Sequence, residues 1–270
     1  MAENLRYPII LAHGLGFRDD GPIGYWGRIP QAIEEAGGRV FLAETDSNGS
    51  VAENGAVLLR RIDEVLAETG SEKVNIIAHS KGGLDSRYAV STLGAGDRVA
   101  SLTTLATPHH GSKTVDRLLR LPRPLIRFGC LCVDGFCRLL GDKRPDTWNA
   151  ISGFRTADAA AFNAANPDDA RVFYQSYAFV MKNPASDLLM WLPNLVVGFV
   201  EGENDGLLPP EAVRWGEFRG VIRGNGRRGV SHCDEIDLRR RPMTRSKGEG
   251  VSDILELYAD IVQGLRARGF

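Results

Sequence analysis

The stretch Lys73–Leu84 reads KVNIIAHSKGGL, and it joins a short apolar run to a serine that lies between small residues. The run, Val74–Ala78, contains β-branched residues and follows a break at Gly70, so it predicts a buried strand. The apolar pattern that follows Gly83 predicts a helix. A strand, a sharp turn with serine at its apex and a helix together indicate a nucleophile elbow, in which a strained backbone lifts the serine hydroxyl clear of the sheet.

Ser80 is the candidate nucleophile of this turn. The turn requires small residues two positions on either side of the serine, and these are Ala78, where glycine is usual, and Gly82. The same geometry points the backbone N–H of Lys81 at the place where an oxyanion would form. Five loosely defined positions also recur by chance, but the predicted strand and helix lie on the correct sides of this serine.

A second apolar run, Tyr7–Ala12, predicts a buried strand that ends in His13–Phe17, HGLGF. A strand that runs into HG-x-G near the N-terminus resembles the place where α/β-hydrolases have their second oxyanion donor, which here would be the N–H of Leu15. A plain glycine-rich turn is the alternative. The chain lacks G-x-G-x-x-G and GK[ST] motifs, which disfavours phosphate binding.

Length and composition restrict the class of protein. A chain of 270 residues can form one α/β domain, and a net charge of −1 argues against binding to nucleic acid. No apolar run reaches the ~18–20 residues of a membrane-spanning helix. The segment Met1–Arg6 is short and polar, so we expect either an intracellular location or, if a leader has been removed, a secreted one. We also expect a monomer.

Apolar periodicity predicts a regular alternation of strands and helices in the first half of the chain, which favours a mostly parallel sheet flanked by helices in a single domain over residues 1–270. The expected strands are Tyr7–Ala12, Arg39–Ala43, Val74–Ala78, Val99–Ala106, Val172–Val180, Leu195–Val200 and Glu217–Ile222. Helices are expected at Tyr25–Ala36, after a capping box of Ser50 and Glu53, after Ser80, at Asp146–Phe162 and at Val251–Leu265.

The alternation breaks at about residues 113–165, where apolar residues are mixed with arginines. Apolar surface with a basic rim, inserted just after a strand of the site, predicts a lid over an apolar substrate cleft. An ordinary helical insertion packed on the sheet is the alternative.

Serine is a weak nucleophile at neutral pH and needs a base, and in α/β-hydrolases the chain order is Ser, acid, His. Only His232 follows both Ser80 and the carboxylates near residue 205, so His232 is the candidate base. Asp205, on a glycine-rich turn after a predicted late strand, is the candidate acid. The other candidate acids are Glu201, Glu203 and Asp234.

Five motifs together resemble the bacterial true lipases, the triacylglycerol lipases. They are HGLGF at His13–Phe17, AHSKGGL at Ala78–Leu84, LTTLATPHHGS at Leu102–Ser112, NDGLLP at Asn204–Pro209 and SHCDEID at Ser231–Asp237. The resemblance implies an α/β-hydrolase fold, Ser80, Asp205 and His232 as the triad, and Leu15 and Lys81 as oxyanion donors. The segment between residues 112 and 205 matches poorly, and in the family this region shapes the acyl pocket.

The resemblance also implies a structural calcium ion near the catalytic histidine loop. Asp234 stands at one of the two aspartate positions, Asp187 is the candidate for the other, and backbone carbonyls near Leu238 and Pro242 would complete the site. Oxygen ligands of this kind suit Ca²⁺. The alternative is that Asp234 only braces the loop through hydrogen bonds.

We therefore expect a serine carboxylic-ester hydrolase, a lipase or esterase, that forms an acyl-enzyme on Ser80 and needs no organic cofactor. Its substrate would be an acyl ester or lipid, met in solution or at a lipid–water interface. The same triad could act on thioesters or polyesters. A non-catalytic scaffold that binds an apolar ligand is the alternative from a different class.

Overall fold

The computed structural model describes residues 4–16, 19, 24–139, 145–245 and 248–270. Within these residues one sheet has the strand order β2-β1-β3-β4-β5-β6, and each neighbouring pair is parallel. The strands are β1 (Ile9–Ala12), β2 (Val40–Leu42), β3 (Val74–His79), β4 (Val99–Leu105), β5 (Phe173–Val180) and β6 (Glu217–Arg223). The parallel sheet predicted from the alternating sequence pattern is therefore confirmed.

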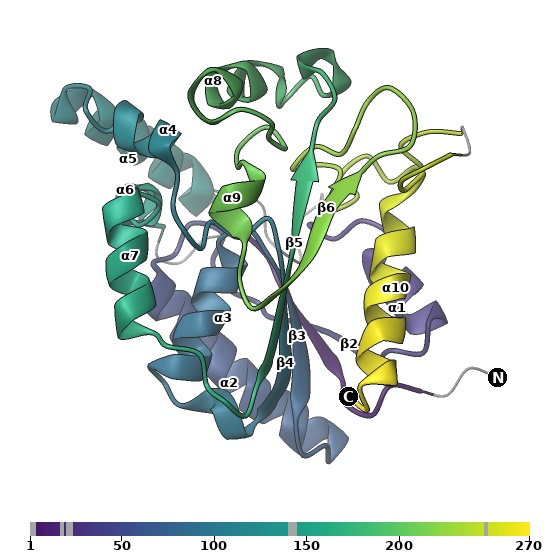
Figure 1. The fold of residues 1–270 in the computed structure, drawn as a ribbon. Helices are drawn as coiled ribbons and strands as arrows, with labels where there is room; N and C mark the ends of the chain where they lie inside the picture. Colours follow the sequence, from purple (N-terminus) through teal and green to yellow (C-terminus); the bar gives the residue numbers. More distant parts are fainter. Residues whose placement is uncertain (1–3, 17–18, 20–23, 140–144, 246–247) are drawn as a thin grey trace.

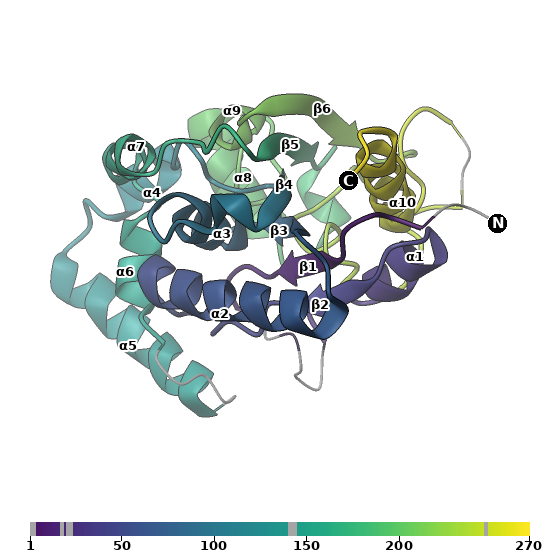
Figure 2. The ribbon, with the colours of Figure 1, turned by 90° about the horizontal axis from the view of Figure 1, so that it is seen from below.

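Helices cover both faces of this sheet (Figures 1 and 2). On one face lie α1 (Ile29–Glu35) and α10 (Ile254–Ala267), and on the other lie α2 (Val51–Thr69) and α3 (Gly82–Ser91). Successive side chains of a strand point to opposite faces, so β1 contributes Ile9 and Leu11 to the core under α10 and Ile10 to the core under α2. The sheet is thus buried on both sides, as parallel sheets usually are.

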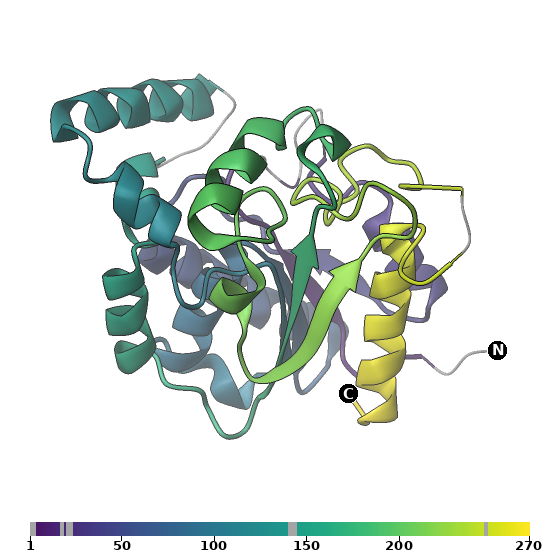
Figure 3. The ribbon, with the colours of Figure 1, turned by 45° about the horizontal axis from the view of Figure 1, so that its top comes forward.

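The segment between β4 and β5 is helical. It contains α4 (Lys113–Leu118), α5 (Arg123–Leu139), α6 (Thr147–Ser152) and α7 (Thr156–Ala165). The helix expected at Asp146–Phe162 is thus two helices separated by a short turn. Figure 3 shows α5 reaching away from the sheet, at the side of the molecule where α4 lies.

One expected strand is a helix. Leu195–Val200 belongs to α8 (Trp191–Glu201), which follows the short turn η2 (Pro184–Ser186). A short uncharged apolar run does not by itself distinguish a strand from a helix. Leu195 and Phe199 of this run are exposed, whereas a central strand would bury them, and β6 already pairs with the free edge of β5.

Helix α8 lies above the carboxyl ends of the strands, on the same side as the turns that follow β3 and β5 (Figure 1). The chain returns from α8 to the sheet edge at residue 204, where the N–H of Met181 donates to the carbonyl of Asn204. The short helices η1 (Ala95–Asp97) and α9 (Pro210–Val213) complete the described elements. Among these helices, none is both long and apolar enough to span a membrane.

Candidate active site

The predicted elbow is present between β3 and α3. Ser80 has φ 53°, a left-handed conformation that is costly for a residue other than glycine, and its N–H donates to the carbonyl of Leu105 at 2.9 Å. Glycine is required at position 82, because a Cβ there would lie only 2.4 Å from the carbonyl oxygen of Ala12. The strained turn is thus fixed by the two strands on either side of β3.

The loop after β1 packs directly against this serine. A Cβ on Gly14 would lie 2.7 Å from the Cβ of Ser80, so only glycine fits at that position. The backbone N–H of Gly14 is already used, since it donates to the hydroxyl of Tyr25. The N–H groups of Leu15 and Lys81, the two predicted oxyanion donors, have no hydrogen-bond acceptor among the residues that the structure describes.

The side chain of Lys81 forms a buried ion pair and does not face the reaction site. Its ammonium group is buried and bonds both oxygens of Asp85, at 2.7 and 2.8 Å. Asp85 also accepts from Asn54, and burial raises the pKa of its carboxyl. The ion pair therefore anchors the first turn of α3, and only the backbone of Lys81 faces the reaction site.

His232 is held by Asp205. Its ring Nδ1 lies 2.9 Å from Asp205 Oδ2, and its backbone N–H donates to the Asp205 carbonyl at 2.8 Å. The other carboxylate oxygen accepts from the N–H groups of Leu207 and Leu208, which fixes its direction. The His232 ring lies 4.4 Å from the ring of His79, the residue before Ser80. The side-chain partners of His232 are the carboxyl groups of Asp205 and Glu235, and no hydrogen bond joins its ring to the Ser80 hydroxyl.

The rival carboxylates have other partners. Glu201 accepts from Ser112 and Thr114 and so ties the end of α8 to the start of α4. Glu203 is exposed and pairs with Arg223. Of the candidate acids, Asp205 is therefore the one that the structure brings to His232 Nδ1.

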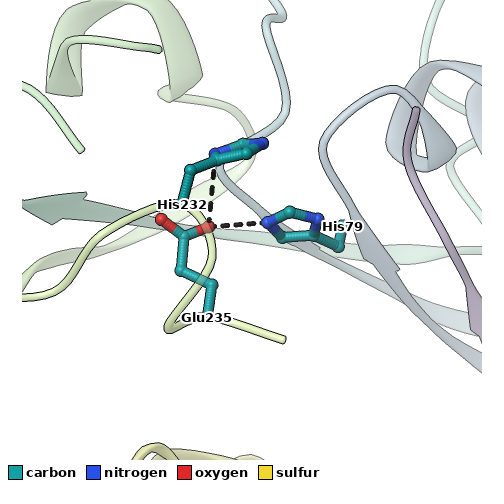
Figure 4. A group of neighbouring side chains, drawn as sticks. All are labelled: His79, His232 and Glu235. Atoms are coloured by element: carbon teal, nitrogen blue, oxygen red, sulfur yellow. Dashed lines mark hydrogen bonds and ion pairs between the residues drawn. The ribbon is translucent and has the colours of Figure 1, made fainter. Parts of the chain in front are cut away.

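Glu235 is a site residue that the sequence reasoning did not single out, although it lies in the SHCDEID motif three positions after His232. Its carboxyl is fully buried between the rings of His79 and His232, with Oε2 at 2.8 Å from His79 Nε2 (Figure 4). Burial, followed by the neighbouring charge of Asp205, raises its pKa well above the usual value. Its other oxygen, Oε1, has no donor among the described residues, while Asp205 lies within hydrogen-bonding reach. Both the raised pKa and the lack of a donor to Oε1 are explained if Glu235 is protonated and donates a hydrogen bond to Asp205.

The same cluster continues to the loop after β1. Burial lowers the pKa of His79 well below its usual value, so its ring is neutral. The Tyr25 hydroxyl lies 2.7 Å from His79 Nδ1 and accepts from Gly14, so Tyr25 donates to Nδ1 and His79 Nε2–H donates to Glu235. A chain of hydrogen bonds therefore runs in one direction from the Gly14 N–H through Tyr25 and His79 to Glu235, the neighbour of Asp205.

Three buried side chains, those of His79, His232 and Glu235, each offer an atom that can bind a metal ion. Two observations argue against that use. His232 Nδ1 is directed at Asp205, and His79 Nε2 is directed at Glu235. Both nitrogens already have partners, so the cluster is described more simply as a hydrogen-bond network.

The predicted calcium ligands do lie together. Asp187 and Asp234 both accept from the hydroxyl of Ser231, at 2.6 and 2.9 Å. Each carboxylate also contacts an arginine: Asp187 pairs with Arg239 at 2.7 Å and Asp234 with Arg228 at 3.1 Å. Two carboxylates that are already neutralised by two guanidinium groups do not fit a divalent cation.

Comparisons with known proteins identify the family of this chain. A family model described as palmitoyl protein thioesterase matches residues 8–166. A triacylglycerol lipase of Vibrio cholerae is 31% identical over 264 residues, which cover 86% of this chain and 80% of that protein. Triacylglycerol lipase 2 of Saccharomyces cerevisiae is 28% identical over 264 residues, 92% of this chain and 75% of that protein.

Solved structures show the same fold at lower identity. Staphylococcus hyicus lipase superposes with a TM-score of 0.73 at 15% identity, covering 99% of this chain and 97% of that one. The mature form of Bacillus licheniformis lipase BlEst2 gives a TM-score of 0.66 at 20% identity, with 87% and 88% covered. The chain therefore belongs to the lipase family of the α/β-hydrolase superfamily, within the sequence family of the palmitoyl protein thioesterase model, and it is a carboxylic-ester hydrolase.

Proposed function

We propose that Ser80, His232 and Asp205 are the catalytic triad of this ester hydrolase and that Leu15 and Lys81 donate the N–H groups of its oxyanion hole. The observation that carries the proposal is the bond between His232 Nδ1 and Asp205 at 2.9 Å, at the sheet edge where Ser80 has φ 53°. That bond leaves Nε2 of His232 as the basic nitrogen, which is the atom a serine nucleophile needs.

The reaction then follows from the positions of these groups. Ser80 Oγ attacks the ester carbonyl carbon and passes its proton to His232 Nε2, while the N–H groups of Leu15 and Lys81 stabilise the oxyanion. His232 next protonates the leaving alcohol, and an acyl-enzyme remains on Ser80. Water gives a proton to His232 and attacks the acyl carbonyl. His232 then returns this proton to Ser80 Oγ as the acyl–Oγ bond breaks, which releases the carboxylic acid. Asp205 keeps the tautomer of His232 and stabilises its charged form.

Glu235 and His79 would act as positioning residues for this reaction. A neutral Glu235 donates to Asp205 without adding a second negative charge beside His232. Because the same chain of bonds reaches Gly14, it holds the loop that carries Leu15 in register with the acid. The network thus joins the two halves of the site, the oxyanion loop and the acid, which lie far apart in the sequence.

We infer that the substrate is an apolar acyl ester that the enzyme meets at a lipid surface. Figure 1 shows α8 above the carboxyl ends of the strands. Exposed apolar side chains lie on α8 and in the loops on either side of it: Leu188, Leu189, Trp191, Leu192, Leu195, Val196, Phe199 and Leu207. Helix α8 has no charged residue before Glu201. An exposed apolar patch of this extent is typical of a surface that meets lipid or another apolar partner.

Helix α5, within the predicted lid at about residues 113–165, presents Phe128 and Leu131 to solvent. It contacts α6, where Asp134 accepts from the N–H of Thr147 and the Arg127 guanidinium lies 5.0 Å from the centre of the Trp148 ring. We infer that α5 and α8 together border the entrance to the site, so that both would contact a lipid aggregate.

A chain-length series tests this function. Rates on p-nitrophenyl esters from C2 to C16, with and without detergent micelles, are expected to rise toward medium or long acyl chains and to vanish in Ser80→Ala. A maximum at C2–C4 would assign a small acyl pocket and contradict the lipid-surface part of the proposal. Equal inactivity of the wild type and Ser80→Ala on every ester would contradict the triad.

A thioesterase activity is a second candidate, because a family model described as palmitoyl protein thioesterase matches residues 8–166. The triad can attack a thioester carbonyl by the same steps, with a thiol as the leaving group. Comparison of kcat/KM on palmitoyl-CoA and on p-nitrophenyl palmitate separates the two. We expect the oxygen ester to be the better substrate; a preference of tenfold or more for the thioester would assign the second function instead.

A further inference from the structure

Two distant segments meet beneath the His232 loop at a buried cluster of charges. Asp187 follows η2 and begins the segment that leads into α8, while Asp234 lies two residues after His232. Both carboxylates are almost fully buried, with the two residues 2% and 4% exposed. They share the hydroxyl proton of Ser231, so the cluster connects the base of the α8 segment to the loop that carries the catalytic histidine.

Two arginines supply the positive charge of this cluster. The Arg239 guanidinium bonds Asp187 Oδ2 at 2.7 Å, and its Nε lies 3.8 Å from Asp234 Oδ1. Arg228 donates through Nη2 to both oxygens of Asp234, at 3.1 and 3.3 Å, and through Nε to the carbonyl of Ser186. Two negative and two positive groups therefore balance, and the arginines reach across from one segment to the other.

The oxygens of both carboxylates are occupied by donors. Asp187 Oδ1 accepts from the N–H of Leu189 at 2.9 Å, and its Oδ2 accepts from Ser231 and Arg239. Burial acts to raise the pKa of Asp187, but these hydrogen bonds and the charge of Arg239 together hold it below the usual value, so the group is a carboxylate. A calcium ion takes six to eight oxygen ligands at about 2.3–2.6 Å, and it would face the two guanidinium groups at close range.

We propose that Arg228 and Arg239, together called the guanidinium clasp, stabilise the buried carboxylates of Asp187 and Asp234 in place of a structural divalent cation. The His232 loop of this enzyme is therefore held without calcium. Arginine suits the position because its planar fork bonds a carboxylate and a carbonyl at once and stays charged at any physiological pH. The role is structural, so it stands whether or not His232 is the catalytic base.

Thermal unfolding of the full chain tests the clasp directly. In the wild type the melting temperature is expected to be the same in EDTA and in millimolar CaCl₂, and equilibrium dialysis is expected to find no tightly bound calcium. A melting temperature that falls in EDTA and returns with CaCl₂, or one calcium ion retained per chain, would overturn the proposal.

Substitution of each arginine tests how much it contributes to the stability of the folded protein. Arg228→Gln and Arg239→Gln leave a buried carboxylate without its cation, so each is expected to lower the melting temperature by several degrees. Arg223→Gln is the matched control, since it breaks an exposed arginine–carboxylate pair with Glu203 and is expected to shift the melting temperature by about 1 °C or less. Clasp variants as stable as Arg223→Gln would contradict the proposal. If a clasp variant fails to fold, the calcium measurements on the wild type still decide it.

Discussion

At the scale of single residues, the site depends on which carboxyl groups are charged. Asp205 accepts from two backbone N–H groups and pairs with His232, and Glu235 is buried beside it with an oxygen that accepts from no described residue. The two carboxyls are neighbours but have different hydrogen-bond partners, so their proposed roles differ: Asp205 orients His232, and Glu235 positions Asp205.

Asp205→Asn tests the acid. The amide cannot stabilise a charged imidazole and can favour the wrong tautomer of His232, so kcat is expected to fall by roughly 10³–10⁴-fold with little change in fold. Glu203→Gln is the control, because Glu203 is exposed and pairs with Arg223 at the surface, and its kcat should stay within about twofold of wild type. Steady-state ester hydrolysis measures both; equal rates for the two variants would reject Asp205 as the acid.

Glu235→Gln tests whether the carboxyl of Glu235 is neutral in the native state. In the native state the pKa of Glu235 is raised, so above about pH 4.5 the unfolded chain loses this proton while the native state keeps it. The native state then binds more protons, and the free energy of unfolding decreases as pH rises, by up to about 1.4 kcal/mol per pH unit, until the native group also ionises. Glutamine cannot titrate, so the variant should lose this part of the decline.

Urea unfolding at intervals from pH 5 to pH 8 measures the difference between the wild type and Glu235→Gln. We expect the curves to diverge, with the variant gaining relative stability toward high pH. Parallel curves would mean that Glu235 is ionised in the native state. The same variant keeps a hydrogen-bond donor toward Asp205, so it should retain much of the esterase activity, whereas Glu235→Ala should lose more.

At the scale of elements, the elbow was predictable because its requirements are local. A strand, a serine and small neighbours lie within Lys73–Leu84. Close approach of the end of β1 explains the glycine at position 82, and close approach of Ser80 explains the one at position 14. Helix α8 was not predictable in the same way. Its apolar run fits a buried strand equally well, and the exposed face of α8 conflicts with the usual burial of such residues.

Gly82→Ala tests the packing of the elbow. A Cβ at this position would meet backbone oxygens of Ala12 and His13 at 2.4 and 2.5 Å, and backbone cannot move aside cheaply. We expect a loss of about 1–3 kcal/mol in the free energy of unfolding and a reduced kcat. Gly264→Ala in α10 is the control, since open space surrounds it and alanine there should stabilise the helix by ~0.5–1 kcal/mol. Chemical denaturation of both variants checks the contrast.

Phe199→Ser tests the proposed lipid surface of α8. The side chain is 87% exposed, so the substitution should leave the melting temperature nearly unchanged while it removes apolar contact with a lipid aggregate. Activity on emulsified triacylglycerol should fall several-fold and activity on soluble p-nitrophenyl butyrate should not. Phe199→Leu, which keeps the apolar surface, should behave as wild type. An equal loss on both substrates would indicate a general defect instead.

At the scale of the whole molecule, periodicity and chain order predicted the parallel sheet, the elbow and the residues brought together as His232 and Asp205. What sequence could not predict were pairings between segments far apart in the chain. His79 meets Glu235 across 156 positions, and Asp187 meets Ser231 across 44. The calcium site stays a prediction, and the same limit applies to it: the resemblance names two aspartates, but the arginines that pair with them are identified only once the loops have packed together.

The central claim is that Ser80 is activated by His232, and covalent labelling tests it most directly. A fluorophosphonate probe reacts with an activated serine, so the wild type should bind one probe per chain, and mass spectrometry of the digest should locate it on Ser80. Ser80→Ala and His232→Ala should not label. A wild type that remains unlabelled, or that carries the probe on another serine, would contradict the account.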